Sequence, residues 1–282
     1  MKGDAVIHPS FPARLRARSL HHGRRGQRGV ALFVVIVFVL MSMLLALWAS
    51  RTSMFNELVV GNDADYQRAF EAAQALLQDA ELDIRGERAD GYACDAGDVS
   101  TLPDEVCRRG SVTKFPLEAQ ELSPLLADLK AQPVHCRHGL CTRRTGRQDF
   151  WNNTTVTDAA AGEFPLTSLT VNTPTDRVGA RYGQYTGALT GSSTSPANPI
   201  LADTSAANRG GWYWIEVLPY DESSKSSNLI QGSGTGLLPL NLTPSVVYRI
   251  TALAYGRKTN IAGNPVTVVV LQETYAPTRR KD

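Results

Sequence analysis

The fold is decided by the stretch Gln27-Arg28-Gly29-Val30-Ala31-Leu32-Phe33-Val34, which opens an apolar run that continues to Ala49. Ser42 is the one polar residue between Val30 and Ala49. About 20 helical residues at 1.5 Å each extend roughly 30 Å, which is the thickness of the hydrocarbon core of a bilayer. We therefore expect residues 30–50 to form a membrane-spanning helix.

Basic residues precede the apolar run. Residues 1–29 carry seven basic side chains and one acidic side chain, and the whole chain has a formal net charge of +2, so the remainder is net acidic. By the positive-inside rule, the basic end of the span stays in the cytoplasm and the residues after Arg51 lie in the periplasm or outside the cell. Because the positive charge belongs to the N-terminus, the pI gives no reason to predict nucleic-acid binding.

A second helical pattern follows the apolar run. The apolar residues that share one face of it are Tyr66, Ala69, Phe70, Ala73, Leu77, Ala80 and Ile84. Gly86 is expected to end the helix, and Gly61-Asn62 is expected to kink or interrupt it. The sequence thus predicts one helix over residues 30–85, apolar on all sides in its first half and amphipathic in its second half.

The four cysteines all lie between residues 87 and 150. Because a periplasmic domain favours disulfides, we expect Cys94 to pair with Cys107 and Cys136 with Cys141, each closing a short loop, although crossed pairings stay open. The alternative is a zinc site made of His135, Cys136, His138 and Cys141. Adjacent ligands at 135 and 136 suit a tetrahedral site poorly, so disulfides are preferred.

Three strands are predicted near the C-terminus, over residues 212–218, 246–255 and 266–275, with the last two forming an antiparallel hairpin. Trp212 and Trp214 share one strand face and are expected in the core. Residues 154–208 are rich in Thr, Ser, Ala, Gly and Pro and are interpreted as long, partly mobile surface loops. An antiparallel sheet packed on Phe70, Leu76 and Leu77 of the amphipathic helix gives an α+β fold.

Several segments of the sequence resemble the corresponding segments of the PilX family of type IV pilus minor pilins. The junction Arg28-Gly29-Val30 is similar to the type III leader of prepilins. The similarity extends to residues 60–62 and 68–81 and to the C-terminal phrases 248–256 and 268–275. The resemblance implies a pilin-like fold, and it implies that prepilin peptidase removes the leader after Gly29. The family would also predict methylation of Val30 at the new N-terminus.

Position 34 departs from the general pilin pattern. Most pilins carry a glutamate as the fifth residue of the mature chain, where its carboxylate pairs with the terminal amine of the neighbouring subunit. Here that position is Val34. A subunit that enters beneath another would lack this pair, whereas a subunit that starts the filament does not need it. We therefore hypothesise that the chain lies at or near the filament tip and primes assembly.

The domain organisation follows from these features. The expected segments are a cytoplasmic leader (1–29), the membrane or filament-core half of the helix (30–50), its amphipathic half (51–86) and a disulfide-containing periplasmic head (87–282). An ordinary signal peptide is a weaker alternative, because Trp48 lies where the cleavage site should be. A simple uncleaved anchor also remains open.

The resemblance implies a role in twitching motility and adhesion. The expected partners are other minor pilins, the major pilin, the inner-membrane assembly platform and a tip adhesin. The expected location is the inner membrane, with the head in the periplasm, and then the pilus. The alternatives are a type II secretion tip pseudopilin and a plain membrane-anchored periplasmic binding module.

No catalytic motif, metal site or cofactor site is predicted, so an enzyme is not expected. Residues 232–236 form a glycine-rich stretch, but no lysine follows it as in a phosphate-binding loop.

Overall fold

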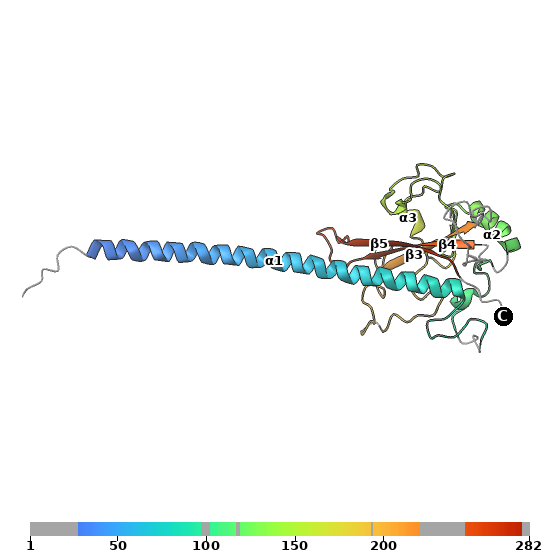
Figure 1. The fold of residues 1–282 in the computed structure, drawn as a ribbon, viewed down its shortest axis with the longest axis horizontal. Helices are drawn as coiled ribbons and strands as arrows, with labels where there is room; N and C mark the ends of the chain where they lie inside the picture. Colours follow the sequence, from blue (N-terminus) through green and yellow to red (C-terminus); the bar gives the residue numbers. More distant parts are fainter. Residues whose placement is uncertain (1–27, 97–101, 117–118, 193, 220–245, 278–282) are drawn as a thin grey trace, which may run out of the picture. The chain divides into compact units, whose positions relative to one another are not determined.

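The computed structural model describes residues 28–96, 102–116, 119–192, 194–219 and 246–277. It divides the chain into two compact units, Met1–Glu57 and Leu58–Asp282. Residues 1–27 of the expected leader (1–29) and the glycine-rich stretch 232–236 lie outside the described residues. The helices and strands, labelled in Figure 1 where there is room, are α1 (Arg28–Arg85), α2 (Ala119–Ala131), β1 (Cys136–Arg137), β2 (Leu140–Thr142), α3 (Leu166–Leu169), β3 (Gly211–Pro219), β4 (Val246–Tyr255) and β5 (Val268–Tyr275).

The helix α1 confirms the expected amino-terminal element. It contains 58 residues. Every side chain from Val30 to Glu57 is exposed, and the helix is long and apolar enough to cross a membrane. The apolar surface of this first unit is therefore left for lipid or for other chains to cover.

Gly86 ends α1 as expected, in the left-handed conformation with a φ of 68°. The Gly86 N–H donates to the Asp83 carbonyl at 3.1 Å, and the Glu87 N–H donates to the Leu82 carbonyl at 2.9 Å. These two bonds form a Schellman motif, which satisfies carbonyls that the last helical turn leaves free.

The expected interruption at Gly61-Asn62 is wrong, because α1 continues unbroken through both residues. A Cβ at Gly61 would lie 3.1 Å from Lys258 Nζ. That amino group donates to Asn62 Oδ1 at 2.6 Å. Gly61 therefore provides room for a lysine from the β4–β5 loop instead of breaking the helix.

The sheet has five strands in the order β1-β2-β3-β4-β5. β3 with β4 and β4 with β5 are antiparallel, which confirms the predicted hairpin. The expectation of a wholly antiparallel sheet is wrong, because β2 pairs with β3 in parallel. Between Thr142 and Gly211 the chain makes a connection long enough to re-enter the sheet in the same direction, which a tight hairpin could not do.

Both faces of β3 are covered, and every residue from Gly211 to Val217 is buried. Tyr213, Ile215 and Val217 belong to the cluster that includes the buried alanines of α1. Trp212 and Trp214 belong to a second cluster with Phe150 and Leu169, which confirms their predicted place in the core. Figure 1 shows α1 on one side of the sheet and α3 on the other.

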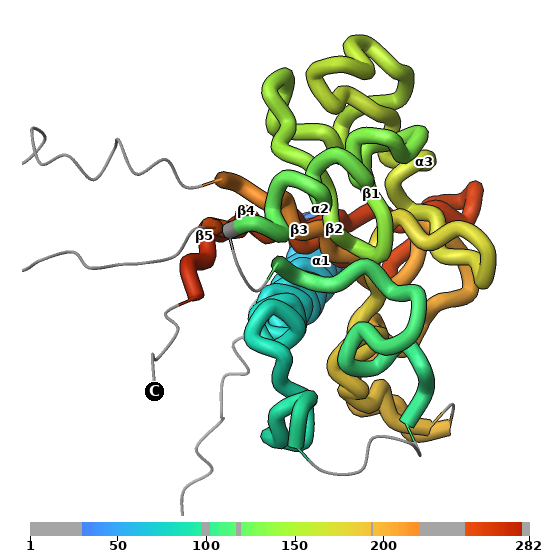
Figure 2. Tube along the Cα trace, turned by 90° about the vertical axis from the view of Figure 1, so that its right-hand side faces the viewer, coloured from blue at the N-terminus to red at the C-terminus, as the bar shows by residue number. Residues whose placement is uncertain are grey.

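Residues 154–208 contain no regular element except α3 among those that the structure describes. They are nevertheless not confined to the surface, which corrects the expectation of surface loops. Their buried members include Leu169, Val178, Tyr185, Ile200 and Leu201. In Figure 2 the backbone of this region folds around the sheet and the end of α1. The segment thus supplies part of both cores.

Candidate functional site

The residues predicted for processing and assembly lie at the start of α1. Gly29 and Val30 are in its first turn. The side chains of Val30 and Val34 are 64% and 42% exposed within the chain. Residues four positions apart lie on the same side of a helix, so Val30 and Val34 present neighbouring apolar surface. No carboxylate occupies position 34 to pair with an amine.

Within the second unit, three aspartates lie on the face of α1 that packs against the head. Asp65, Asp79 and Asp83 are only 2%, 2% and 5% exposed. They follow the same spacing as the buried residues Ala69, Ala72 and Leu76. Because burying an unpaired carboxylate is costly, each of them must find donors in the head.

We call the contact between residues 65–83 of α1 and the head the joint. Asp83 forms the most buried ion pair of this joint. Arg108 Nε donates to Asp83 Oδ1 at 2.8 Å, and Arg108 Nη2 donates to Asp83 Oδ2 at 2.6 Å. The Arg108 guanidinium carbon lies 4.5 Å from the Phe115 ring and 4.1 Å from the Tyr185 ring. Burial is the largest single influence and alone would lower the pKa of Arg108, but the charge of Asp83, its hydrogen bonds and the nearby tyrosines together outweigh burial and raise it. The pair is therefore charged and bidentate.

Asp79 binds residues 183–186 of the head. Its carboxylate accepts hydrogen bonds from the Thr186 hydroxyl and, at 2.8 Å, from the Gly183 N–H. Burial raises the pKa of Asp79 to about 7, with a smaller contribution from the neighbouring charge of Asp83. Asp79 is thus a titratable group of the joint whose charge changes near neutral pH.

Asp65 binds the β4–β5 loop at the opposite end of the joint. Its Oδ1 accepts from the Arg257 N–H at 2.8 Å and from the Lys258 N–H at 3.3 Å. A Cβ at Gly256 would collide with Asp65 Oδ2, so glycine is required beside this carboxylate. The loop between β4 and β5 is therefore fixed to α1 through its backbone.

The cysteines pair as expected, Cys94 with Cys107 and Cys136 with Cys141. The first bond fastens the residue next to Arg108, and the second joins β1 to β2. Because both sulfurs of the second pair are used, they are not available as zinc ligands. His138 Nδ1 accepts from the Thr113 N–H at 3.1 Å. Burial and nearby arginines lower the pKa of His138 to about 4, so it is a neutral structural residue.

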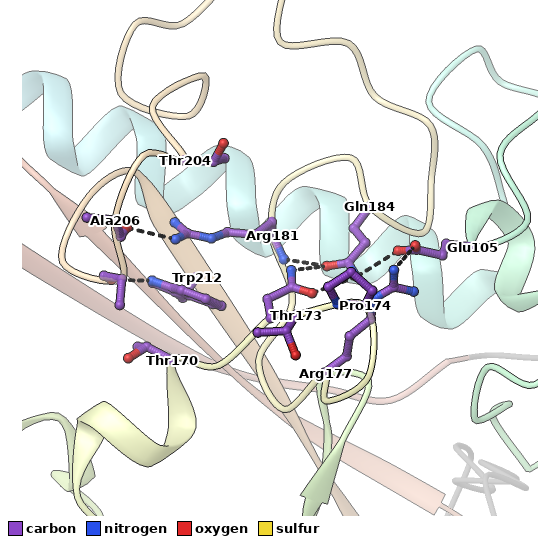
Figure 3. A pocket seen from close by; sticks show the side chains of 12 residues that line it. Glu105, Thr170, Thr173, Pro174, Arg177, Arg181, Gln184, Thr204, Ala206 and Trp212 are labelled. Atoms are coloured by element: carbon purple, nitrogen blue, oxygen red, sulfur yellow. Dashed lines mark hydrogen bonds and ion pairs between the residues drawn. The ribbon is translucent and has the colours of Figure 1, made fainter.

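A polar cavity of about 510 Å³ opens on the head, and we call it the arginine cleft (Figure 3). It is lined by Glu105, Thr170, Asn172, Thr173, Pro174, Arg177, Arg181, Gln184, Thr204, Ala206, Ala207 and Trp212. Gln184 lies in the middle of this wall. Its Oε1 accepts from the Asn172 side chain at 2.9 Å and from the Arg181 N–H at 3.0 Å. Its Nε2 donates to Glu105 at 2.9 Å, so the wall is held rigidly.

Two family models match the chain. The PilX N-terminal model matches residues 28–78. The model described as type IV pilus assembly protein PilX C-term matches residues 137–277, which is half of the chain. The chain belongs to the PilX family of type IV pilus assembly proteins. No curated protein and no solved structure matched it significantly.

The two PilX matches cover most of α1 and most of the head, and they leave residues 79–136 between them. Asp79, Asp83, Arg108 and the first disulfide all lie in that interval. Sequence reasoning missed the three aspartates of the joint and the arginine cleft. The aspartates could have been found from their spacing, because they continue the buried face of the helix. Nothing in the sequence pattern could have brought the residues of the cleft together.

Proposed function

We propose that this PilX-family chain is a minor pilin that primes assembly of a type IV pilus and is incorporated at or near its tip. The observation that carries the proposal is Val34, which removes the carboxylate that would receive the amine of a neighbouring subunit. Burying an unpaired charge in a bundle of apolar helices costs on the order of several kcal/mol. A subunit without this pair is suited to the first position of a filament, where no subunit stands above it.

The same proposal includes processing and orientation. Prepilin peptidase cuts after Gly29 on the cytoplasmic side, and Val30 becomes the methylated N-terminus. The basic leader keeps that end in the cytoplasm, and the head lies in the periplasm before the subunit enters the pilus. The proposed partners are other minor pilins, the major pilin, the assembly platform and a tip adhesin, and the proposed cellular roles are twitching and adhesion.

Mass spectrometry of the protein from its native host tests the processing step. A mature chain that begins with methylated Val30 supports the proposal. A chain that retains residues 1–29, or begins near Ser50, contradicts it.

Labelling of the head on isolated pili tests the position. We expect the wild-type protein at filament ends and Val34→Glu along the shaft, because the new carboxylate can accept the terminal amine of a neighbour. Val35→Glu is the matched control: it adds the same charge about 100° around the helix, away from the amine. Even labelling of the shaft by wild-type protein would refute the tip position.

Deletion of the gene distinguishes a type IV pilus minor pilin from a type II secretion tip pseudopilin. Loss of surface pili with normal secretion supports the pilus, and loss of secreted enzymes with normal pili supports the alternative.

A further inference from the structure

Arg181 is a half-buried cation that forms no ion pair with any carboxylate in the described part of the chain, although the charge of Asp203 acts on it from farther away. Its Nη1 donates to the carbonyls of Arg209 at 2.6 Å and Gly211 at 3.2 Å, and its Nη2 donates to the Ala206 carbonyl at 3.0 Å. Among the described residues, no acidic oxygen lies within ion-pair distance of it. These carbonyls use three of its five N–H donors. The Nε–H and one Nη2–H are left without a protein acceptor in the described part of the chain.

The guanidinium of Arg181 is also held in place. Its central carbon lies 3.5 Å from the centroid of the Trp212 ring, and the Trp212 Nε1–H donates to the Ala207 carbonyl at 2.8 Å. Burial lowers the pKa of Arg181 to about 10, which still leaves it charged at neutral pH. A fixed cation with unused donors at the wall of an open cavity attracts an anion.

Arg177 adds a second guanidinium to the same cleft. It forms an ion pair with Glu105, and both side chains are about one quarter exposed, at 23% and 27%. Figure 3 shows this pair at one end of the cleft and Arg181 with Trp212 at the other, with Gln184 between them. The three ionised side chains of the lining give a net charge of +1, from two arginines and one glutamate. The cleft is therefore suited to a ligand with one negative charge.

The rest of the lining is rich in hydroxyl and amide groups. Thr204 has no hydrogen-bond partner for its hydroxyl among the described residues, and the Thr170 hydroxyl donates to the Leu166 carbonyl at 3.0 Å, so its oxygen can still accept. Pro174 and two alanines are the small apolar residues of the lining. A volume of about 510 Å³ lies within the range of small-ligand sites.

We propose that the arginine cleft binds an acidic saccharide, with the sugar carboxylate at the unused Nε–H and Nη2–H of Arg181 and the sugar hydroxyls at Arg177, the threonines and the Asn172 amide. The charge of the lining selects one carboxylate, and its hydroxyls and amides favour a polyhydroxylated ligand over one with apolar side chains. The site lies on the head and uses no residue of the filament-forming helix. It is independent of the position of the chain in a pilus.

Binding is tested on the full chain in detergent by isothermal titration calorimetry with glucuronate, glucose and inorganic phosphate as probes. We expect glucuronate to bind, and glucose and phosphate to bind at least tenfold more weakly, because each satisfies only one half of the site. Equal affinity for phosphate and glucuronate would overturn the saccharide assignment in favour of a general anion site. No binding of glucuronate would overturn the proposal altogether.

Variants test where the probe binds. Arg177→Gln should weaken glucuronate binding about tenfold or more, because it removes one charged hydrogen bond. Thr204→Val removes a hydroxyl from the lining of the cleft without disturbing any protein hydrogen bond that the structure describes. We expect it to weaken glucuronate binding several-fold. Arg143→Gln is the matched control, since Arg143 is exposed and does not line the cleft. Unchanged affinity in the first two variants, with thermal unfolding like that of the wild type, would refute the site.

Discussion

Substitution of Asp83 by asparagine gives the sharpest test of the joint between helix and head. The change keeps the shape of the side chain but leaves Arg108 charged between the Phe115 and Tyr185 rings. The side chains of Arg108 and Asp83 are only 5% and 2% exposed. Breaking a buried pair from one side costs about 3–5 kcal/mol, whereas an exposed pair contributes about 0–1 kcal/mol. Because asparagine can still accept one hydrogen bond, we expect a loss of about 3 kcal/mol in the free energy of unfolding.

Urea denaturation of the full chain in detergent measures this loss, with the fluorescence of the buried Trp212 and Trp214 as the signal. Glu87→Gln is the matched control, because its pair with Arg85 is exposed and should contribute less than about 1 kcal/mol. The double variant Asp83→Asn with Arg108→Met removes both charges. We expect it to be more stable than the sum of the single losses by at least about 1 kcal/mol. A loss for Asp83→Asn as small as that of Glu87→Gln would refute the reasoning.

Three further predictions concern the head and the part of α1 that packs against it. Since burial raises the pKa of Asp79 to about 7 from 3.8, the folded chain retains a proton between those pH values that the unfolded chain releases. The stabilisation by this proton is complete below about pH 4 and is lost as the pH rises through 7, so urea titrations at pH 5 and 8 should show wild type losing stability relative to Asp79→Asn. Replacing both Cys94 and Cys107 by serine should lower the free energy of unfolding by about 3 kcal/mol. A reductant, which lowers the stability of the wild type by breaking this bond, should have no such effect through it in the variant. The two helix glycines should respond in opposite directions in thermal unfolding. Gly61→Ala should stabilise by up to about 1 kcal/mol, because the lysine tip that it meets can move, and Gly86→Ala should destabilise by about 1 kcal/mol, because its φ of 68° suits glycine.

The long elements of the fold could be predicted from the sequence because each carries its own pattern. β4 was predicted with the bounds that the structure has, and β3 and β5 within two residues. The short strands β1 and β2 were missed, since two or three residues cannot establish an alternation. α2 was also missed, although its leucines at 122, 125, 126 and 129 follow a helical spacing; Pro124 lies inside it, where a proline usually argues against a helix.

Residues whose partners are distant in sequence could not be predicted. Asp79 lies 104 residues from Gly183, and Asp65 lies 192 residues from Arg257. A pattern within one helix shows that an aspartate occupies a buried position, but not which donors neutralise it. The arginine cleft poses the same difficulty, because Glu105 and the loops around Gln184 and Thr204 meet only in the folded head.

The attachments at Asp65 and Asp83 lie 18 positions apart along one helix, about 27 Å at the standard rise. Tension applied along this part of the helix is therefore shared between a backbone clamp at the β4–β5 loop and an ion pair near the helix end. Two attachments that bear a load at the same time withstand a larger force than attachments that break one after another. The spacing also opposes torque, because the head is held at two levels and cannot swivel about a single point.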